Sequence, residues 1–139
     1  MRTDFWFDSC GAGKIHCCKW TPEGEPKAVL QIIHGIAEFV ERYDTFANYL
    51  TEQGYVVVAE DHMGHGQSIN GDGIQGYFHG GWFNAVADSY KLLQDTRAEY
   101  PGVLDAVVDL EAKCVTVTGD ADIAAIKKAI EAEDFEVVE

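Results

Sequence analysis

The chain has 139 residues, 47% of them hydrophobic, and a formal net charge of −14 at pH 7. This length fits one domain, and no apolar run approaches the roughly 18 residues of a membrane helix, so we expect a globular protein with no membrane partner. The acidic balance argues against nucleic acid as a partner, because phosphate contacts need lysine and arginine.

The cysteines indicate a reducing compartment. Cys10, Cys17, Cys18 and Cys114 form no C-x-x-C spacing, and the N-terminus has no apolar signal core. Both observations predict free thiols and a cytoplasmic location. Adjacent residues on a strand point to opposite faces, so Cys17 and Cys18 are not expected to bind one metal ion together.

The first hundred residues predict alternating strands and helices. Residues 4–9 and 14–21 read as strands on either side of a Gly11-Ala12-Gly13 turn, which predicts an antiparallel hairpin. Residues 28–33 and 55–60 are nearly continuous apolar runs, as expected for strands buried on both faces of a parallel sheet.

Two helices accompany these strands. The first, over 41–53, joins the two buried strands in a βαβ unit, and its inward side is predicted to hold Tyr43, Phe46, Ala47 and Leu50. The second, over 82–99, follows a glycine-rich loop over 61–81. Its predicted inward face consists of Trp82, Ala85, Val86, Ser89 and Leu93.

The composition changes near Tyr100. Every Trp, Tyr and His lies at or before this position, whereas the last 39 residues hold one aromatic residue. The tail predicts a hairpin of strands 103–110 and 114–118, then a helix over 121–132 and a strand over 135–138.

Two polar loops directly follow the two buried strands. The first contains His34-Gly35-Ile36 and the second Asp61-His62-Met63-Gly64-His65-Gly66-Gln67-Ser68. Because parallel strands end at the same edge of a sheet, and open α/β sheets bind ligands there, both loops are predicted to share one rim.

These loops, with the following GYFHGGWFNAVADSYKLL, resemble the N-terminal part of the α/β-hydrolases, specifically the lysophospholipase and monoacylglycerol lipase branch, over about residues 5–102. The resemblance implies an oxyanion-hole loop formed by His34 and Gly35, with a backbone N–H from Ile36. It also implies a family loop whose members are Asp61, His62, Gly64, His65, Gly66 and Ser68.

The same resemblance implies a catalytic serine in a G-x-S-x-G turn, followed by an acid and a histidine. The chain contains no such motif, and the nearest string, over 66–70, lacks the second glycine. No serine and no histidine follows Pro101. The catalytic triad therefore cannot be assembled within this chain.

Two other uses of the loop residues remain open. His62, His65 and His79 share the glycine-rich region with Ser68, so a Ser–His contact is sterically possible, although such residues more often close loops through backbone hydrogen bonds. Asp61, His62 and His65 resemble a metal cluster, but an H-x-x-H pair on a loop lacks the fixed geometry that zinc requires. We therefore predict no metal ion and no other cofactor.

The tail resembles the second half of a heavy-metal-associated domain of the copper-chaperone type, a ferredoxin-like βαββαβ module. The likeness covers about 39 residues and includes V-D-L-E-x-K-x-V-T-V. Metal in that family is bound by an M-x-C-x-x-C loop of the first half, where this chain has hydrolase-like sequence. The resemblance thus implies that metal-chaperone activity is lost and that Cys114 is a small strand residue.

We expect an α/β fold, with a single mixed sheet and helices on both faces. A truncated α/β-hydrolase core, 1–100, is completed by the ββαβ half of a ferredoxin-like module, 101–139, in one domain. The tail is expected to dock beside 28–33. Where it covers that edge poorly, the exposed strand edges favour a homodimer.

The expected function is that of a recombined or engineered chimera without catalytic activity of its own. One alternative is an esterase or lysophospholipase-type hydrolase of carboxylic esters. Another is a metal-binding or interaction module.

Overall fold

The computed structural model spans the chain and describes residues 1–69, 73–101, 106–109, 114–117 and 124. The chain divides into two compact units, Met1–Tyr100 and Pro101–Glu139. This boundary coincides with the change in composition, and the single domain expected over 1–139 stays a prediction.

The first unit contains a four-stranded mixed sheet in the order β1-β2-β4-β3. The strands are β1 (Arg2–Asp8), β2 (Lys14–Trp20), β3 (Ala28–Ile32) and β4 (Tyr55–Glu60). β1 pairs with β2, and β2 with β4, in antiparallel register, whereas β3 and β4 are parallel. The predicted hairpin and the parallel pair are confirmed, and β4 is buried as expected. β3, at the edge of this sheet, is only partly buried, and Leu30 is 39% exposed.

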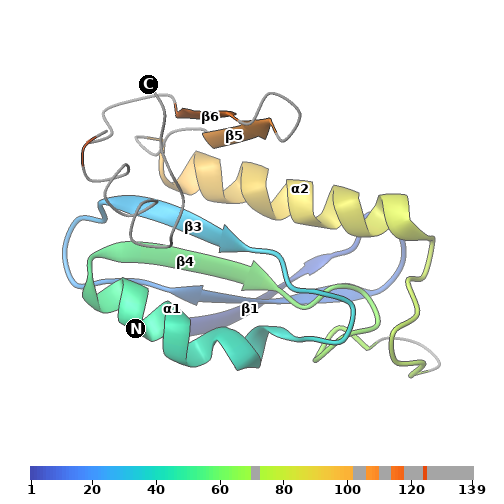
Figure 1. Ribbon diagram of the computed structural model, residues 1–139. Helices are drawn as coiled ribbons and strands as arrows, with labels where there is room; N and C mark the ends of the chain where they lie inside the picture. The colour runs from blue at the N-terminus through green and yellow to red at the C-terminus, as the bar shows by residue number, and fades with distance from the viewer. Residues whose placement is uncertain (70–72, 102–105, 110–113, 118–123, 125–139) are drawn as a thin grey trace. The chain divides into compact units, whose positions relative to one another are not determined.

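Helices cover both faces of this sheet, as expected. A 3₁₀ turn, η1 (Val40–Tyr43), leads into α1 (Asp44–Glu52) on one face, and α2 (Trp82–Glu99) crosses the other face (Figure 1). Within the part of the chain that the structure describes, neither helix is long and apolar enough to cross a membrane.

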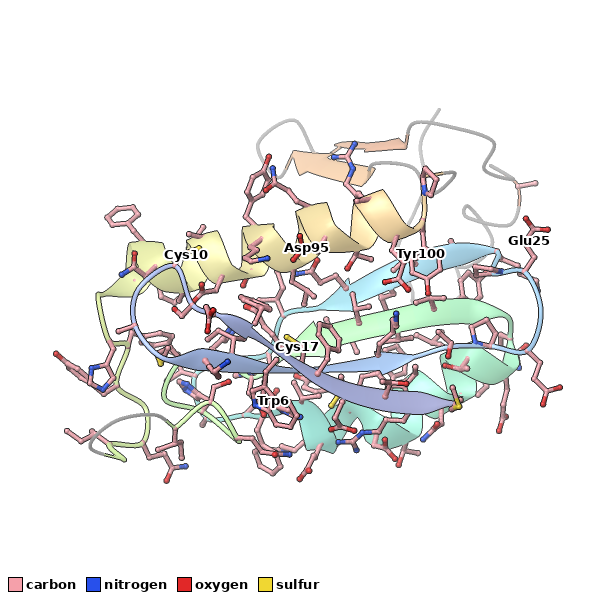
Figure 2. All side chains as sticks on the ribbon, turned by 180° about the vertical axis from the view of Figure 1, so that it is seen from behind. Trp6, Cys10, Cys17, Glu25, Asp95 and Tyr100 are labelled. Carbon is pink, nitrogen blue, oxygen red and sulfur yellow. The ribbon has the colours of Figure 1, made fainter. Side chains whose placement is uncertain are left out.

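Each face of the sheet has its own apolar core. Cys18, Trp20 and Val57 pack on the α1 side with Val40, Ala47 and Ala59. Ile15, Cys17, Met63 and Leu92 pack on the α2 side. Cys17 and Cys18 therefore point to opposite faces, as predicted for adjacent strand residues. Cys17 is labelled among the side chains of the sheet in Figure 2.

The predicted inward face of α2 is wrong by part of a turn. Trp82 and Val86 are 60% and 48% exposed. Ala85 is buried, as predicted, and the other buried residues of the helix are Asp88, Leu92 and Thr96. The physical reason is Asp88, whose carboxylate accepts hydrogen bonds from Ser9 Oγ at 2.7 Å and from the Cys10 amide at 2.6 Å. A carboxylate bonded in this way is buried at low cost, and it turns the helix away from its most apolar stripe.

A smaller correction concerns α1. Ala47 is buried and Leu50 packs against the core, as predicted, but Phe46 is 48% exposed. The helix is also shorter than the predicted 41–53, because its first turn is the separate 3₁₀ turn η1.

In the second unit, β5 (Ala106–Asp109) and β6 (Cys114–Val117) form the predicted antiparallel hairpin. They make a two-stranded sheet of their own, so neither strand extends the first sheet at β3. The strand predicted over 135–138 lies outside the described residues, as does the helix over 121–132 except for Ala124, which is helical.

Candidate functional site

The predicted loops meet at the carboxyl ends of β3 and β4, as the βαβ arrangement requires. Most of their side chains are buried: His34, Asp61, His62, His65 and Ser68. Gly35 and Ile36 are exposed, Ile36 at 76%. The rim thus consists of one inward-packed loop and one loop that presents its tip to solvent.

Asp61 holds the second loop in place. Its Oδ1 accepts the Val40 amide at 2.8 Å and its Oδ2 accepts the Gln67 amide at 2.9 Å. Oδ2 also lies 2.8 Å from Nδ1 of His16 on β2. Three chain segments are therefore joined through one buried carboxylate, which makes Asp61 a structural residue.

The histidines tie the two loops to each other. The His62 amide donates to Nε2 of His34, and Nε2 of His62 lies 3.0 Å from the His34 carbonyl oxygen. Nε2 of His65 lies 2.6 Å from the Ile36 carbonyl oxygen. These contacts are the loop-closing bonds to backbone that the sequence favours for such residues.

Burial lowers the pKa of His34, and the neighbouring His62 and His65 lower it further. A neutral ring is also what the hydrogen bonds require, because Nε2 of His34 accepts the His62 amide. The Nδ1 atom faces the Gly35 carbonyl oxygen at 2.8 Å and therefore carries the proton. His34 is thus a fixed acceptor within the rim.

Two glycines make the second loop possible. Gly66 has φ +47°, and a Cβ there would lie 2.3 Å from the Asp61 carboxylate. Gly64 has φ +81°, and a Cβ there would lie 2.4 Å from the Tyr77 carbonyl oxygen. Any side chain at either position would displace the loop, so both glycines are required for packing as well as for backbone conformation.

The first loop, which the resemblance assigns to an oxyanion hole, is a tight turn with an open tip. A tight turn closes with the Glu38 amide donating to the Gly35 carbonyl oxygen at 3.2 Å. A Cβ on Gly35 would meet nothing within 4 Å, so the tip of the loop is open. Exposed backbone donors of this kind stabilise an oxyanion only when a nucleophile delivers one to them.

Each of the three serines is hydrogen-bonded to a backbone amide or to a carboxylate. Ser68 is fully buried, and its Oγ accepts the His16 amide at 2.8 Å. Ser9 donates to Asp88, and Ser89 donates to Glu60 Oε1 at 2.5 Å. His62 Nδ1 lies 3.3 Å from the same Glu60 oxygen, so the acid stands between serine and histidine. Base-assisted attack requires the histidine in that middle place.

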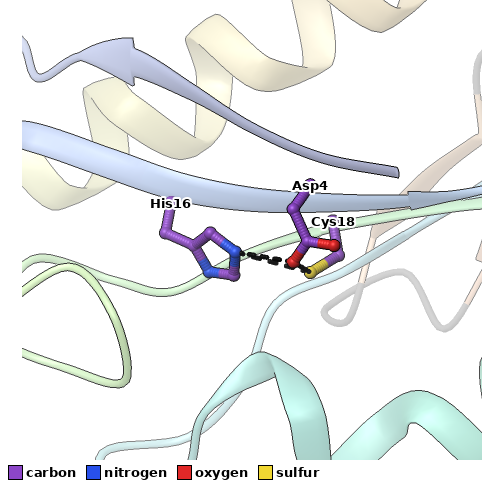
Figure 3. A group of neighbouring side chains, drawn as sticks. All are labelled: Asp4, His16 and Cys18. Atoms are coloured by element: carbon purple, nitrogen blue, oxygen red, sulfur yellow. Dashed lines mark hydrogen bonds and ion pairs between the residues drawn. The ribbon is translucent and has the colours of Figure 1, made fainter. Parts of the chain in front are cut away.

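A second group of polar side chains was missed at the sequence level. Asp4, His16 and Cys18 bring one carboxylate oxygen, one ring nitrogen and one sulfur within 4.8 Å of one another (Figure 3). The signal was present in the hairpin: His16 and Cys18 are two residues apart on one strand, and Asp4 stands opposite Cys18 in register. The group lies on the α1 face, and its His16 is bonded to Asp61 of the second loop.

A groove elsewhere on the unit contains none of the predicted site residues. It is lined by Met1, Thr21, Pro22, Glu23, Asn48, Thr51, Glu52 and Gly54. These residues flank the amino end of β4, opposite to the rim. The groove therefore adds nothing to the chemistry of the rim.

The sheet order, the two helices and the rim loops together define an α/β-hydrolase core. A family model described as serine aminopeptidase, S33, matches residues 24–108, more than half of the chain, and the chain belongs to this family. A second model, described as the heavy-metal-associated domain, matches residues 98–136. The chain thus carries hydrolase-family sequence followed by heavy-metal-associated sequence, as the two resemblances predicted.

Several lipases are relatives of the first part. The chain is 34% identical to human monoglyceride lipase over 89 residues, which is 64% of this chain and 28% of the lipase. It is 36% identical to the monoglyceride lipase homolog of monkeypox virus over 89 residues, 64% of this chain and 31% of that protein. It is 42% identical to protein K6 of vaccinia virus (strain Western Reserve) over 53 residues, 38% of this chain and 64% of K6.

Solved structures of an esterase and a lipase also match this chain. A thermostable carboxyl esterase from Bacillus coagulans matches with TM-score 0.66 and 27% identity, over 73% of this chain and 34% of the esterase. A lipase in its open form matches with TM-score 0.61 and 28% identity, over 74% and 34%. The chain therefore spans about a third of these enzymes and of the first lipase relatives.

Proposed function

We propose that this chain is a recombined or engineered chimera in which a hydrolase core is retained and hydrolysis is lost. The observation that carries the proposal is the order of the two family matches. Hydrolase-family sequence gives way to heavy-metal-associated sequence within residues 98–108, where both models match. No G-x-S-x-G motif precedes residues 98–108, and no serine or histidine follows them.

The contacts of the rim support the same proposal. His62 and His65 bond to backbone carbonyl oxygens, and Ser68 is buried beneath the loop with its oxygen facing the His16 amide. These side chains close loops instead of facing a substrate. In the heavy-metal-associated part, sequence of the first unit stands where the M-x-C-x-x-C loop is expected.

The alternative function, carboxylic ester hydrolysis, takes its motivation from the lipase and esterase relatives. It needs a serine nucleophile, and the chain has three serines, Ser9, Ser68 and Ser89. Ser9 and Ser89 both donate to carboxylates, which leaves Ser68 as the residue to test.

The test is hydrolysis of p-nitrophenyl acetate and butyrate by the purified chain, beside Ser68→Ala and a Ser9→Ala control. We expect no rate above buffer for any of the three, and no labelling by a fluorophosphonate probe. A rate or a label that is present in the parent chain and in Ser9→Ala, and lost in folded Ser68→Ala, would establish the hydrolase instead.

A further inference from the structure

The β1–β2 hairpin places three potential metal ligands on one face. Asp4 stands opposite Cys18 in the register, and His16 precedes Cys18 by two residues, so all three side chains share a face of the sheet. Nε2 of His16 lies 2.9 Å from Asp4 Oδ1, and Sγ of Cys18 lies 3.2 Å from the same oxygen. Sγ and Nε2 are 3.8 Å apart (Figure 3).

We propose that Asp4, His16 and Cys18 form a binding site for Zn²⁺. Zinc binds carboxylate oxygen, imidazole nitrogen and thiolate sulfur at about 2.0–2.3 Å, so tetrahedral ligand atoms lie roughly 3.3–3.6 Å apart. The three observed separations bracket this range. Shifts of roughly half an ångström, starting from rotamers already in place, are enough to bring the three atoms around an ion.

The Asp61 carboxylate, at Nδ1 of His16, orients the imidazole ring toward the proposed site. Asp61 accepts two backbone amides and has no proton to give, so Nδ1 of His16 must donate to it. Nε2 lies 2.9 Å from the Asp4 carboxylate and donates to it in the metal-free chain, so zinc must displace this proton to bind Nε2. A carboxylate that orients the far nitrogen of a ligating histidine is the usual support of zinc sites.

The charges also fit a divalent cation. An Asp4 carboxylate and a Cys18 thiolate together balance Zn²⁺. Arg2 lies 2.9 Å from Asp4 Oδ1, so an ion must draw this oxygen away from the guanidinium, which keeps its other partners, Asp44 at 3.3 Å and Glu41 at 3.7 Å. Burial raises the pKa of Cys18 to about 12, so zinc must displace the thiol proton on binding.

Asp4 is the solvent-accessible residue of the group. Its side chain is 36% exposed, whereas His16 and Cys18 are fully buried. Trp6, on the same strand as Asp4, is half exposed and lies against the His16 ring with centroids 4.8 Å apart. An ion would therefore reach the site beside Asp4, and solvent would supply its fourth ligand.

Cys17 has no part in the site, because it lies in the core on the opposite face. The donor set is therefore one sulfur, one nitrogen and one oxygen, which suits zinc better than magnesium or calcium.

Calorimetric titration of the full, metal-free chain with Zn²⁺ tests the site, with Co²⁺ absorption as a reporter of thiolate ligation. We expect one equivalent of zinc and a thiolate-to-cobalt band. Asp4→Asn, at a partly exposed position, is expected to weaken zinc binding by at least about tenfold. Cys18→Ala is expected to remove the cobalt band, whereas Cys10→Ser and Cys114→Ser keep both signals.

Absence of zinc binding in the parent chain would overturn the proposal and leave the three side chains as a hydrogen-bonded network. Zinc binding that is unchanged in Asp4→Asn and lost in His62→Gln or Cys114→Ser would also overturn it, by placing the ion elsewhere. Circular dichroism and thermal unfolding verify that each variant is folded. If Cys18→Ala does not fold, Asp4→Asn decides the result.

Discussion

Nδ1 of His16 and Oδ2 of Asp61 lie 2.8 Å apart, with both side chains buried. The contact joins the middle of β2 to the loop that follows β4. A backbone hydrogen bond joins the same two residues, because the Asp61 amide donates to the His16 carbonyl oxygen at 2.9 Å. The same pair thus fixes the rim loop and orients the imidazole of the proposed zinc site.

Replacing Asp61 is expected to destabilise the first unit. Asp61→Asn presents an amide to the Val40 and Gln67 N–H groups and to His16, so at least one buried donor loses its acceptor. The expected cost is about 2 kcal/mol or more in the free energy of unfolding, measured by urea denaturation. Asp8→Asn is the matched control, because Asp8 is 85% exposed and pairs only with Lys14 at 3.4 Å. Equal midpoints for the two variants would contradict the role given to Asp61.

Alanine variants of Gly64 and Gly24 distinguish the stability cost of a steric clash from the cost of backbone strain. Both have positive φ, +81° and +85°, but a Cβ meets the Tyr77 backbone at Gly64 and nothing within 4 Å at Gly24. Gly24→Ala is expected to cost roughly 1–2 kcal/mol through φ alone, and Gly64→Ala clearly more. Urea midpoints of the two variants measure the difference. The clash argument fails if Gly64→Ala costs no more than Gly24→Ala.

The central part of the fold could be predicted because the local signals agree with one another. Residues 55–60 and 28–33 are nearly continuous apolar runs, and they form the parallel strands β4 and β3. The structure buries β4, whereas β3 is only partly buried. The inner face of α2 could not be predicted from hydropathy. Its inward turn is set by Asp88, whose burial depends on the distant Ser9 and Cys10.

The shared rim of the two loops could be predicted from the sequence, but the contacts of His16 could not. The chain order of strands and loops was enough to bring Ile36 and His65 to one rim, where they are in contact. No local sequence pattern indicates that His16, on a strand of the hairpin, contacts the Asp61 carboxylate. That contact depends on the antiparallel pairing of β2 with β4, a long-range property. The grouping of Asp4 with Cys18 depends likewise on register and not on spacing.

The thiols are expected to differ in reactivity. Burial raises the pKa of Cys17 well above its usual range and that of Cys18 to about 12. Desolvation and Asp88 raise the pKa of Cys10 as well, but Cys10 is exposed at the hairpin turn, where the reagent reaches it. Because the thiolate is the reactive form, brief treatment of the folded chain with iodoacetamide in EDTA should modify Cys10 and spare the other two. Peptide mapping by mass spectrometry measures this, with urea-unfolded chain as the control. Equal modification of Cys10 and Cys18 in the folded chain would contradict the burial described for β2.

We further propose a homodimer formed through exposed strand edges. β1 and β3 are the edge strands of the four-stranded sheet, and Leu30 on β3 is 39% exposed. Unpaired edges favour pairing with a second copy. Light scattering is expected to show a dimer that Leu30→Lys weakens, while Phe46→Lys, on the exposed side of α1, leaves it intact. A monomer at all concentrations, or equal weakening by both variants, rules out the β3 edge.

Acidification is expected to destabilise the chain through His34. Burial lowers the pKa of this ring in the folded state, whereas the unfolded chain takes up the proton near pH 6.5. The unfolded state then binds more protons, so the free energy of unfolding falls as the pH drops through about 6.5 and levels off below the folded-state pKa. The cause is structural: protonated Nε2 can no longer accept the His62 amide.

Urea denaturation between pH 7.5 and pH 5 measures this dependence of the free energy of unfolding on pH. His34→Gln should be less stable at pH 7.5 and show a shallower slope, whereas His79→Gln, in the loop before α2, should keep the parent slope. A parent slope that survives in His34→Gln would assign the effect to another group.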